Sequence, residues 1–79
     1  MKTTFDTAEY GRTYGRGPRG LGNWAFRAIY SDGCGSSTES EVWFFRGLYT
    51  TAKRLAREQV KAEAATIGRA REVTIQVLP

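Results

Sequence analysis

The stretch that decides the fold is EVWFFRGLYTTAKRLAREQVKAEAA, which occupies residues 41–65 of this 79-residue chain. Its first part, Glu41 to Tyr49, is rich in aromatic residues and predicts a strand. From Ala52 to about Ala65 nearly every residue favours a helix, and Thr50 or Thr51 can cap its first turn. The stretch therefore predicts one strong strand that leads into one helix.

The predicted strand carries three adjacent aromatic residues: Trp43, Phe44 and Phe45. Because successive side chains of a strand point to opposite faces, these residues place bulk on both faces of the sheet. We therefore expect this strand to be central, or to be covered by the helix on one face and by a long loop on the other.

The predicted helix has an apolar stripe and a basic face. At 100° per residue the apolar side chains cluster on one side: Ala52, Leu55, Ala56, Val60 and Ala64. Gln59 and Glu63 lie near the middle of this stripe, so we expect it to be shallowly buried. The basic side chains lie on the other side: Lys53, Arg54, Arg57 and Lys61. Gly68 follows the helical segment and predicts its end.

The remaining chain supplies further strands and one long loop. Trp24 to Tyr30 and Val73 to Val77 both alternate in character, so each predicts a half-buried strand. Lys2 to Tyr10 predicts a weak edge strand. Residues 11–22 hold five glycines and a proline, which predicts a loop, and residues 31–37 predict a turn-rich connection.

This order of elements predicts an α+β fold. We expect a small antiparallel sheet of three to four strands with one helix packed across it, as a two-layer sandwich. The chain is short enough to form one domain, residues 1–79. A domain of this size buries roughly 60% of the surface that its unfolded chain exposes, so its margin of stability is thin.

The composition excludes several kinds of protein. The chain has no histidine and a single cysteine, Cys34, so it lacks the usual proton shuttle and can form neither an internal disulfide nor a zinc cluster. We expect Cys34 to be a surface thiol and Asp32, Glu39 and Glu41 to form a solvated acidic loop. No catalytic group of residues accompanies them, so we predict a non-enzymatic protein without a metal or cofactor. No apolar run approaches the ~20 residues of a membrane span, and no signal peptide is visible, which predicts a cytoplasmic protein.

Two basic segments carry most of the positive charge of a chain with 12 Lys+Arg and 8 Asp+Glu. Besides the basic helix face, arginines alternate with glycines in the predicted loop, and tyrosines lie beside them. Arg donates forked hydrogen bonds to phosphate, and Tyr can stack on bases or anchor a protein contact. The residues predicted to bind a partner are Tyr10, Arg12, Tyr14, Arg16, Arg19, Lys53, Arg54, Arg57 and Lys61. The alternative is that both segments are ordinary solvated surface.

The opening of the predicted helix carries a resemblance to a known family. Residues 51–59, TAKRLAREQ, follow an aromatic strand and precede a β-branched strand, and they resemble the helix of small phage-encoded anti-CRISPR proteins that act on type I Cascade complexes. The resemblance implies a small antiparallel sheet with one helix, a gene on a phage or mobile element, and action inside the bacterial host cell. It also implies that Lys53, Arg54 and Arg57 contact the Cascade complex or hold DNA.

Two functions remain open at this point. The first, which the resemblance favours, is an inhibitor that binds a Cascade effector subunit and blocks target-DNA binding. A surface that receives DNA is usually basic, so a basic inhibitor needs a locally acidic patch on its target, or it must recruit DNA. The second is a small phage nucleic-acid-binding module that uses the same residues. For both we expect a monomer or a weak dimer that does not contact a membrane.

Overall fold

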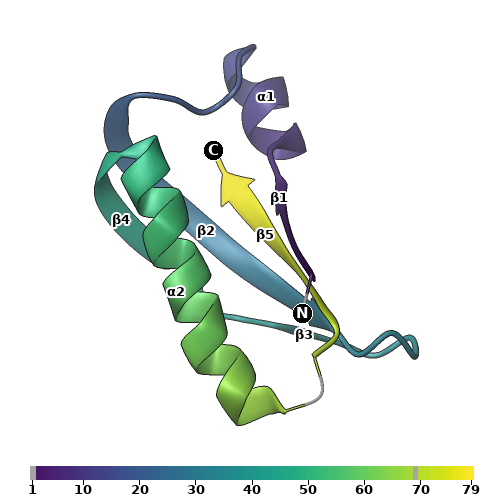
Figure 1. Cartoon of the computed structure of the whole chain (residues 1–79). Coiled ribbons are helices and arrows are strands. Elements are labelled where there is room, and N and C mark those ends of the chain that lie inside the picture. The colour runs from purple at the N-terminus through teal and green to yellow at the C-terminus, as the bar shows by residue number, and fades with distance from the viewer. Residues whose placement is uncertain (1, 69) are drawn as a thin grey trace.

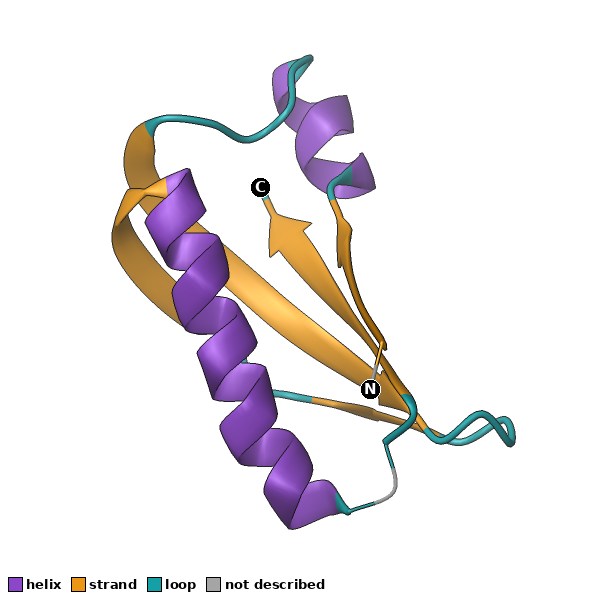
Figure 2. Cartoon of the chain, viewed as in Figure 1, coloured by secondary structure: helices purple, strands orange, loops and turns teal. Residues whose placement is uncertain are grey.

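The computed structural model describes residues 2–68 and 70–79. It shows a five-stranded sheet with a long helix across one face and a short helix at one end (Figures 1 and 2). The elements are β1 (Lys2–Asp6), α1 (Ala8–Tyr14), β2 (Leu21–Ser31), β3 (Ser37–Glu39), β4 (Trp43–Leu48), α2 (Tyr49–Ile67) and β5 (Glu72–Leu78). The predicted α+β class, with a helix packed on a sheet, is confirmed.

β2 is the central strand of the sheet. One edge of β2 pairs antiparallel with β5, and the other edge pairs antiparallel with β4 along its first half and with β3 along its second half. β1 joins the far side of β5 and runs parallel to it. The sheet is therefore mixed rather than wholly antiparallel, because the first and last strands of the chain run in the same direction.

β3 and β4 lie along the same edge of β2, with one extra residue between them. Ile29 is opposite Glu39 in β3. Phe26, three residues before Ile29 on β2, is opposite Trp43, which is four residues after Glu39. The β3–β4 side therefore contains one residue more than β2 over this interval. Such an extra residue is a β-bulge, which bends the strand and raises its local twist.

Ser40 joins the sheet at this bulge. Its hydroxyl oxygen accepts a hydrogen bond from the Ala28 N–H at 2.9 Å, and its own N–H donates to the Ala28 carbonyl at 2.8 Å. The same hydroxyl donates to the Glu41 carbonyl at 2.8 Å. The side chain of Ser40 thus satisfies a backbone donor of the central strand where regular pairing is interrupted.

The core lies between the sheet and α2. Alternate residues of β2 and β5 face α2. The buried side chains of α2 are small, which allows the helix to approach the sheet closely. The buried residues are Trp24, Phe26, Ala28, Tyr30, Ala52, Ala56, Val60, Val73, Ile75 and Val77. The alternation predicted for both strands is confirmed, as is the inner part of the helical stripe. Leu55 and Ala64, at its margins, are only half-buried.

The start of the chain differs from the prediction. The strand expected over residues 2–10 ends at Asp6, and residues 8–14, expected to be strand and loop, form α1. The Asp6 carboxylate accepts the Ala8 N–H at 3.0 Å at the start of α1. Gly15 ends α1 in the left-handed region with φ 68°, where its N–H donates to the Gly11 carbonyl.

The other element boundaries shift more modestly. β2 begins at Leu21, inside the predicted loop, and β3 uses the end of the predicted turn region. α2 begins at Tyr49 rather than after a threonine cap, and among the described residues no side chain caps it. Gly68 ends α2 as predicted, with φ 74° and an N–H bonded to the Ala64 carbonyl.

β4 is an edge strand, which corrects the expectation of a central or doubly covered strand. Phe45 faces the core and packs against Phe26, whereas Phe44 points to the opposite side and is 77% exposed. Neither the helix nor the loop that precedes β2 covers Phe44. The aromatic triplet therefore leaves one large apolar side chain in solvent.

Replacing Ser40 with alanine should lower the free energy of unfolding by about 1–2 kcal/mol, because the Ala28 N–H loses its acceptor in a part-buried place. Urea denaturation followed by far-UV circular dichroism measures this. Ser37→Ala removes an exposed hydroxyl on the same edge and should change stability by less than about 0.5 kcal/mol. Equal stability of the two variants would contradict the role given to Ser40.

Candidate functional site

A chain of aromatic rings connects α1 to the start of α2. Tyr14 and Tyr10 have ring centroids 4.6 Å apart, and Tyr10 and Trp24 are separated by 5.8 Å. Trp24 in turn lies 4.8 Å from Tyr49, the first residue of α2. Aromatic pairs at these separations attract beyond their buried area. They explain why the short helix α1 is held on this domain although it has no buried residue of its own.

Two cations of α2 lie over an aromatic ring from the other end of the chain. The Lys53 ammonium is 4.8 Å from the ring centroid of Phe5 in β1, and the Arg57 guanidinium is 5.1 Å from the same centroid. Lys53 also lies 5.5 Å from the Tyr49 ring. Cation–π contacts of this kind contribute about 0.5–1 kcal/mol at exposed sites. They hold both charges on the side of α2 that faces β1.

The loop before β2 is fastened to the start of α2. The Tyr49 N–H donates to the Gly20 carbonyl at 2.8 Å, and the Trp24 indole N–H donates to the Gly47 carbonyl at 2.9 Å. The first bond brings the end of the arginine-bearing loop against the first turn of the basic helix. In Figure 1 the loop, α1 and the start of α2 all lie at the upper end of the molecule.

The structure brings most of the predicted site residues to this end. We call it the basic–aromatic end, formed by Phe5, Tyr10, Arg12, Tyr14, Arg16, Arg19, Tyr49, Lys53 and Arg57. Tyr10 and Lys53 are half-buried, and the other predicted members are exposed. Arg54 and Lys61 are exposed but lie on the side of α2 opposite the buried stripe, so they belong to a separate outer side of the helix.

Sequence reasoning missed Phe5 and Tyr49. The contact of Phe5 with the cations of α2 depends on the parallel pairing of β1 with β5, in which Phe5 is opposite Ile75. No local pattern indicates that pairing. The sequence predicts Tyr49 as the last residue of a strand. In the structure α2 begins at Tyr49, and this is why the residue lies between Trp24 and Lys53.

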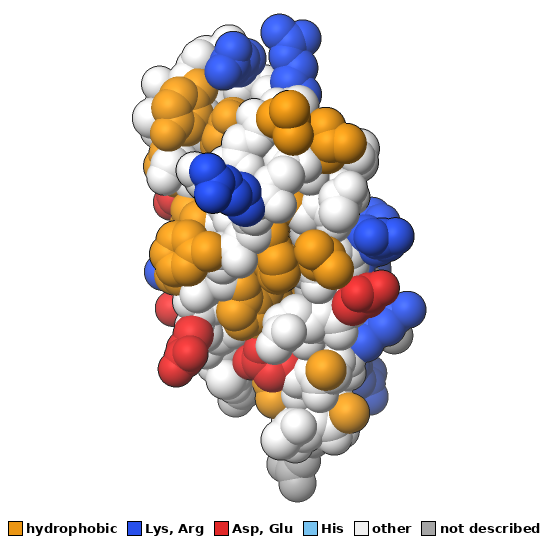
Figure 3. Space-filling model, turned by 90° about the vertical axis from the view of Figure 1, so that its left-hand side faces the viewer, with side chains coloured by type: hydrophobic (Ala, Val, Ile, Leu, Met, Phe, Trp, Pro, Cys, Tyr) orange, Lys and Arg blue, Asp and Glu red, His pale blue; other side chains and the backbone are white. Residues whose placement is uncertain are grey.

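Basic and acidic side chains are unevenly distributed over the domain. The space-filling view in Figure 3 shows Lys and Arg side chains at the upper end of this side of the molecule and along its right margin, whereas the Asp and Glu side chains lie in its middle and lower parts. The opposite end carries both signs of charge, with Asp32 and Glu72 close to Lys2 and Arg71, and Glu9 of α1 lies among the basic residues. The pKa of Tyr49 is raised, mainly by burial; the Arg57 charge lowers it and Tyr10 raises it. Tyr49 is therefore neutral at pH 7 and does not offset the positive charge of this end.

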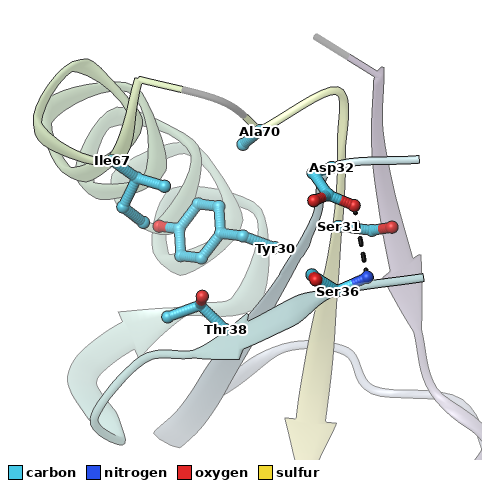
Figure 4. A pocket seen from close by; sticks show the side chains of 7 residues that line it. All are labelled: Tyr30, Ser31, Asp32, Ser36, Thr38, Ile67 and Ala70. Carbon is cyan, nitrogen blue, oxygen red and sulfur yellow. Dashed lines mark hydrogen bonds between the residues drawn. The ribbon is translucent and has the colours of Figure 1, made fainter. Parts of the chain in front are cut away.

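A pocket of about 170 Å³ lies at the other end of α2 (Figure 4). Its lining comes from the β2–β3 hairpin, from the end of α2 and from the segment just before β5: Tyr30, Ser31, Asp32, Ser36, Thr38, Ile67 and Ala70. The Asp32 carboxylate accepts the N–H groups of Cys34 at 2.7 Å and Ser36 at 3.2 Å, so its role is to close the hairpin turn. The Tyr30 hydroxyl is buried and has no hydrogen-bond partner among the described residues.

The described residues hold neither a candidate metal-binding group nor a helix that could span a membrane. Within residues 2–68 and 70–79 there is no group of three or more His, Cys, Asp or Glu that could hold a metal ion. Cys34 is exposed in the hairpin, as expected. Among these residues no helix is long and apolar enough to cross a membrane. The side chains of the basic–aromatic end can make contacts by charge, hydrogen bonding and aromatic stacking.

Comparison of the chain with protein-family models, with curated proteins and with solved structures found no significant match.

Stability should decline at high pH because of Tyr30. Burial, and next the nearby Glu63 charge, raise the pKa of Tyr30 from 10.0 to about 12. The folded protein thus holds this proton more tightly than the unfolded chain, and the resulting stability is present below pH 10 and lost as the pH rises to 12. A shift of this size corresponds to roughly 2–3 kcal/mol.

Urea denaturation between pH 9 and pH 12 measures this decline. In Tyr30→Phe most of it should disappear, and the remainder should reflect Tyr49, whose pKa is also raised. An unchanged profile in Tyr30→Phe would show that another group is responsible.

Proposed function

We propose that the protein is a non-enzymatic nucleic-acid-binding module that holds its ligand at the basic–aromatic end. The observation that carries this proposal is the joint placement of Lys53 and Arg57 over Phe5 beside the loop that bears Arg16 and Arg19. The two basic segments of the sequence thereby form one surface instead of two. A polyanion is the partner that best matches such a surface.

The residue types at this end suit both parts of a nucleic acid. The guanidinium groups of Arg12, Arg16 and Arg19 are exposed and can donate paired hydrogen bonds to phosphate oxygens. Tyr14 is 52% exposed and stacks on Tyr10, so its ring is held at the surface where an unpaired base can stack on it. Since stacking needs an unpaired base, we expect single strands to bind more tightly than duplexes.

Charge reversal tests the surface against a matched control. Lys53→Glu/Arg57→Glu changes the charge of the basic–aromatic end, and Lys2→Glu/Arg71→Glu makes the same change at the opposite end, where Lys2 N–H donates to the Arg71 carbonyl. In gel-shift titrations with single-stranded oligonucleotides, the first pair should weaken binding by more than tenfold and the second by less than threefold. The slope of log affinity against log salt should fall by about 0.7 per lost phosphate contact in the first pair only.

Loss of the contacts with Phe5 could also destabilise the first variant. Arg12→Glu/Arg16→Glu therefore serves as a second test, because both residues are exposed and contribute nothing to the core. It should weaken binding to a similar degree without changing thermal unfolding. Absence of binding by the unaltered protein at low salt, or equal losses at the two ends of the domain, would refute the proposal.

An inhibitor of a type I Cascade complex is the second candidate function. The outer side of α2, with Arg54 and Lys61, lies apart from the basic–aromatic end and offers a separate basic surface to an acidic patch on a protein. This side belongs to the helix whose opening resembles the anti-CRISPR family. Such an inhibitor would come from a phage or mobile element and act in the cytoplasm of the bacterial host.

If the second candidate is correct, the purified protein should reduce target-DNA binding by a type I Cascade complex at equimolar concentration. Arg54→Glu/Lys61→Glu should relieve the inhibition, while Lys2→Glu/Arg71→Glu should retain it. Fluorescence anisotropy of labelled target DNA measures both effects. If no type I Cascade is affected by the unaltered protein, this candidate is eliminated and the nucleic-acid assays are unaffected.

A further inference from the structure

The face of the sheet that points away from α2 carries exposed apolar side chains. Trp24 and Phe45 are cross-strand partners that face the core, so the next pair along, Ala25 and Phe44, faces the other way. We call this the outer sheet face. Its most exposed apolar residues are Leu21 at 80%, Phe44 at 77%, Leu48 at 49% and Val42 at 37%. Among the described residues no helix packs across it, and Figure 2 shows the long helix on one face only.

Charges on this face follow a definite order along the β4–β3 edge. Arg46 is exposed near the end of β4, Phe44 and Val42 follow toward the bulge, and Glu39 is exposed beyond it in β3. Arg46 and Phe44 share a face because they are two residues apart on one strand. Glu39 lies on the same face, because its cross-strand partner Ile29 points away from the core. Along this edge the exposed side chains are therefore basic, then apolar, then acidic.

The neighbouring cation on this face does not project from it. The Arg27 guanidinium and its Nε both donate to the Gln76 side-chain oxygen, at 3.0 and 3.2 Å. These bonds join β2 to β5 across the sheet and hold the Arg27 side chain along its surface. The centre of the outer sheet face is therefore flat enough for another sheet to approach.

We infer that two copies of this chain associate through their outer sheet faces, with the strands of one copy antiparallel to those of the other. The two-fold axis lies between the two sheets and runs perpendicular to the strands. It places the β4–β3 edge of one copy over the β4–β3 edge of the other, with the residues along that edge in the opposite order. Arg46 of one copy then meets Glu39 of the other, twice, and Phe44 meets Val42 of the second copy between them. Such a self-complementary patch is what a two-fold interface requires.

The size of the face limits the area that this dimer can bury. The molecule measures 34 × 22 × 18 Å, so its broad side offers at most about the 800 Å² per partner of a standard interface. Area does not fix affinity, but ion pairs at an exposed rim contribute little, so we expect a micromolar dimer rather than an obligate one. The basic–aromatic ends of the two copies lie at opposite poles and stay accessible.

Analytical ultracentrifugation over a range of protein concentrations tests the inference. The unaltered protein should dimerise in the micromolar range, and Phe44→Ser should weaken the dimer by at least tenfold. Tyr14→Ser is the matched control, because it removes another exposed aromatic ring that lies outside this face, and it should leave the dimer unchanged. Circular dichroism checks that each variant is folded.

A charge swap tests the orientation of the two copies. Arg46→Glu and Glu39→Arg should each weaken the dimer, and the combined variant should restore it, because each copy then presents the pair in reverse. A monomeric protein at all concentrations, or a combined variant no better than the single ones, would refute the inference. So would a monomeric protein that binds single-stranded oligonucleotide and loses this binding in Phe44→Ser, since the face would then hold nucleic acid.

Discussion

β2 is hydrogen-bonded along both of its edges, and the rest of the domain depends on this double pairing. β5, β4 and β3 join the sheet through β2, and β1 joins through β5. The register also decides which side chains form the core, because a slip of one residue would turn Trp24, Phe26 and Tyr30 to the opposite face. The described residues form one buried core cluster, which contains these rings together with the inner side chains of α2. The packing of α2 therefore depends on the pairing of β2.

The same pairing assembles the basic–aromatic end. β2 begins where Gly20 accepts the first N–H of α2, and Trp24 binds the Gly47 carbonyl just before that helix. α2 therefore begins without a side-chain cap among the described residues, because backbone from a neighbouring segment takes one of its free donors. The same contact holds the end of the arginine-bearing loop beside the first turn of α2, which brings the arginines of the loop toward the cations of the helix.

Periodicity in the sequence indicates what repeats locally and nothing more. It predicted β2, β5, the inner stripe of α2 and the end of α2 at Gly68, because each depends on neighbouring residues. It missed α1, since Gly11 and the tyrosines suggest strand and loop, whereas stacking of Tyr10 on Trp24 supports a helix. The candidate site was predicted as two separate clusters. Their union requires Phe5 beside α2, which follows from the parallel pairing of opposite ends of the chain.

The aromatic triplet of β4 includes two residues that pack against the core and one that does not. Strand geometry lets Trp43 and Phe45 face α2 and forces Phe44 outward. Because no helix covers that face among the described residues, Phe44 gains little burial from its own chain. Together with Leu21, Val42 and Leu48, Phe44 forms the exposed apolar surface through which we propose that two copies make contact. The opposite charges of Arg46 and Glu39, placed on either side of it, give that contact a direction, which apolar exposure alone would not.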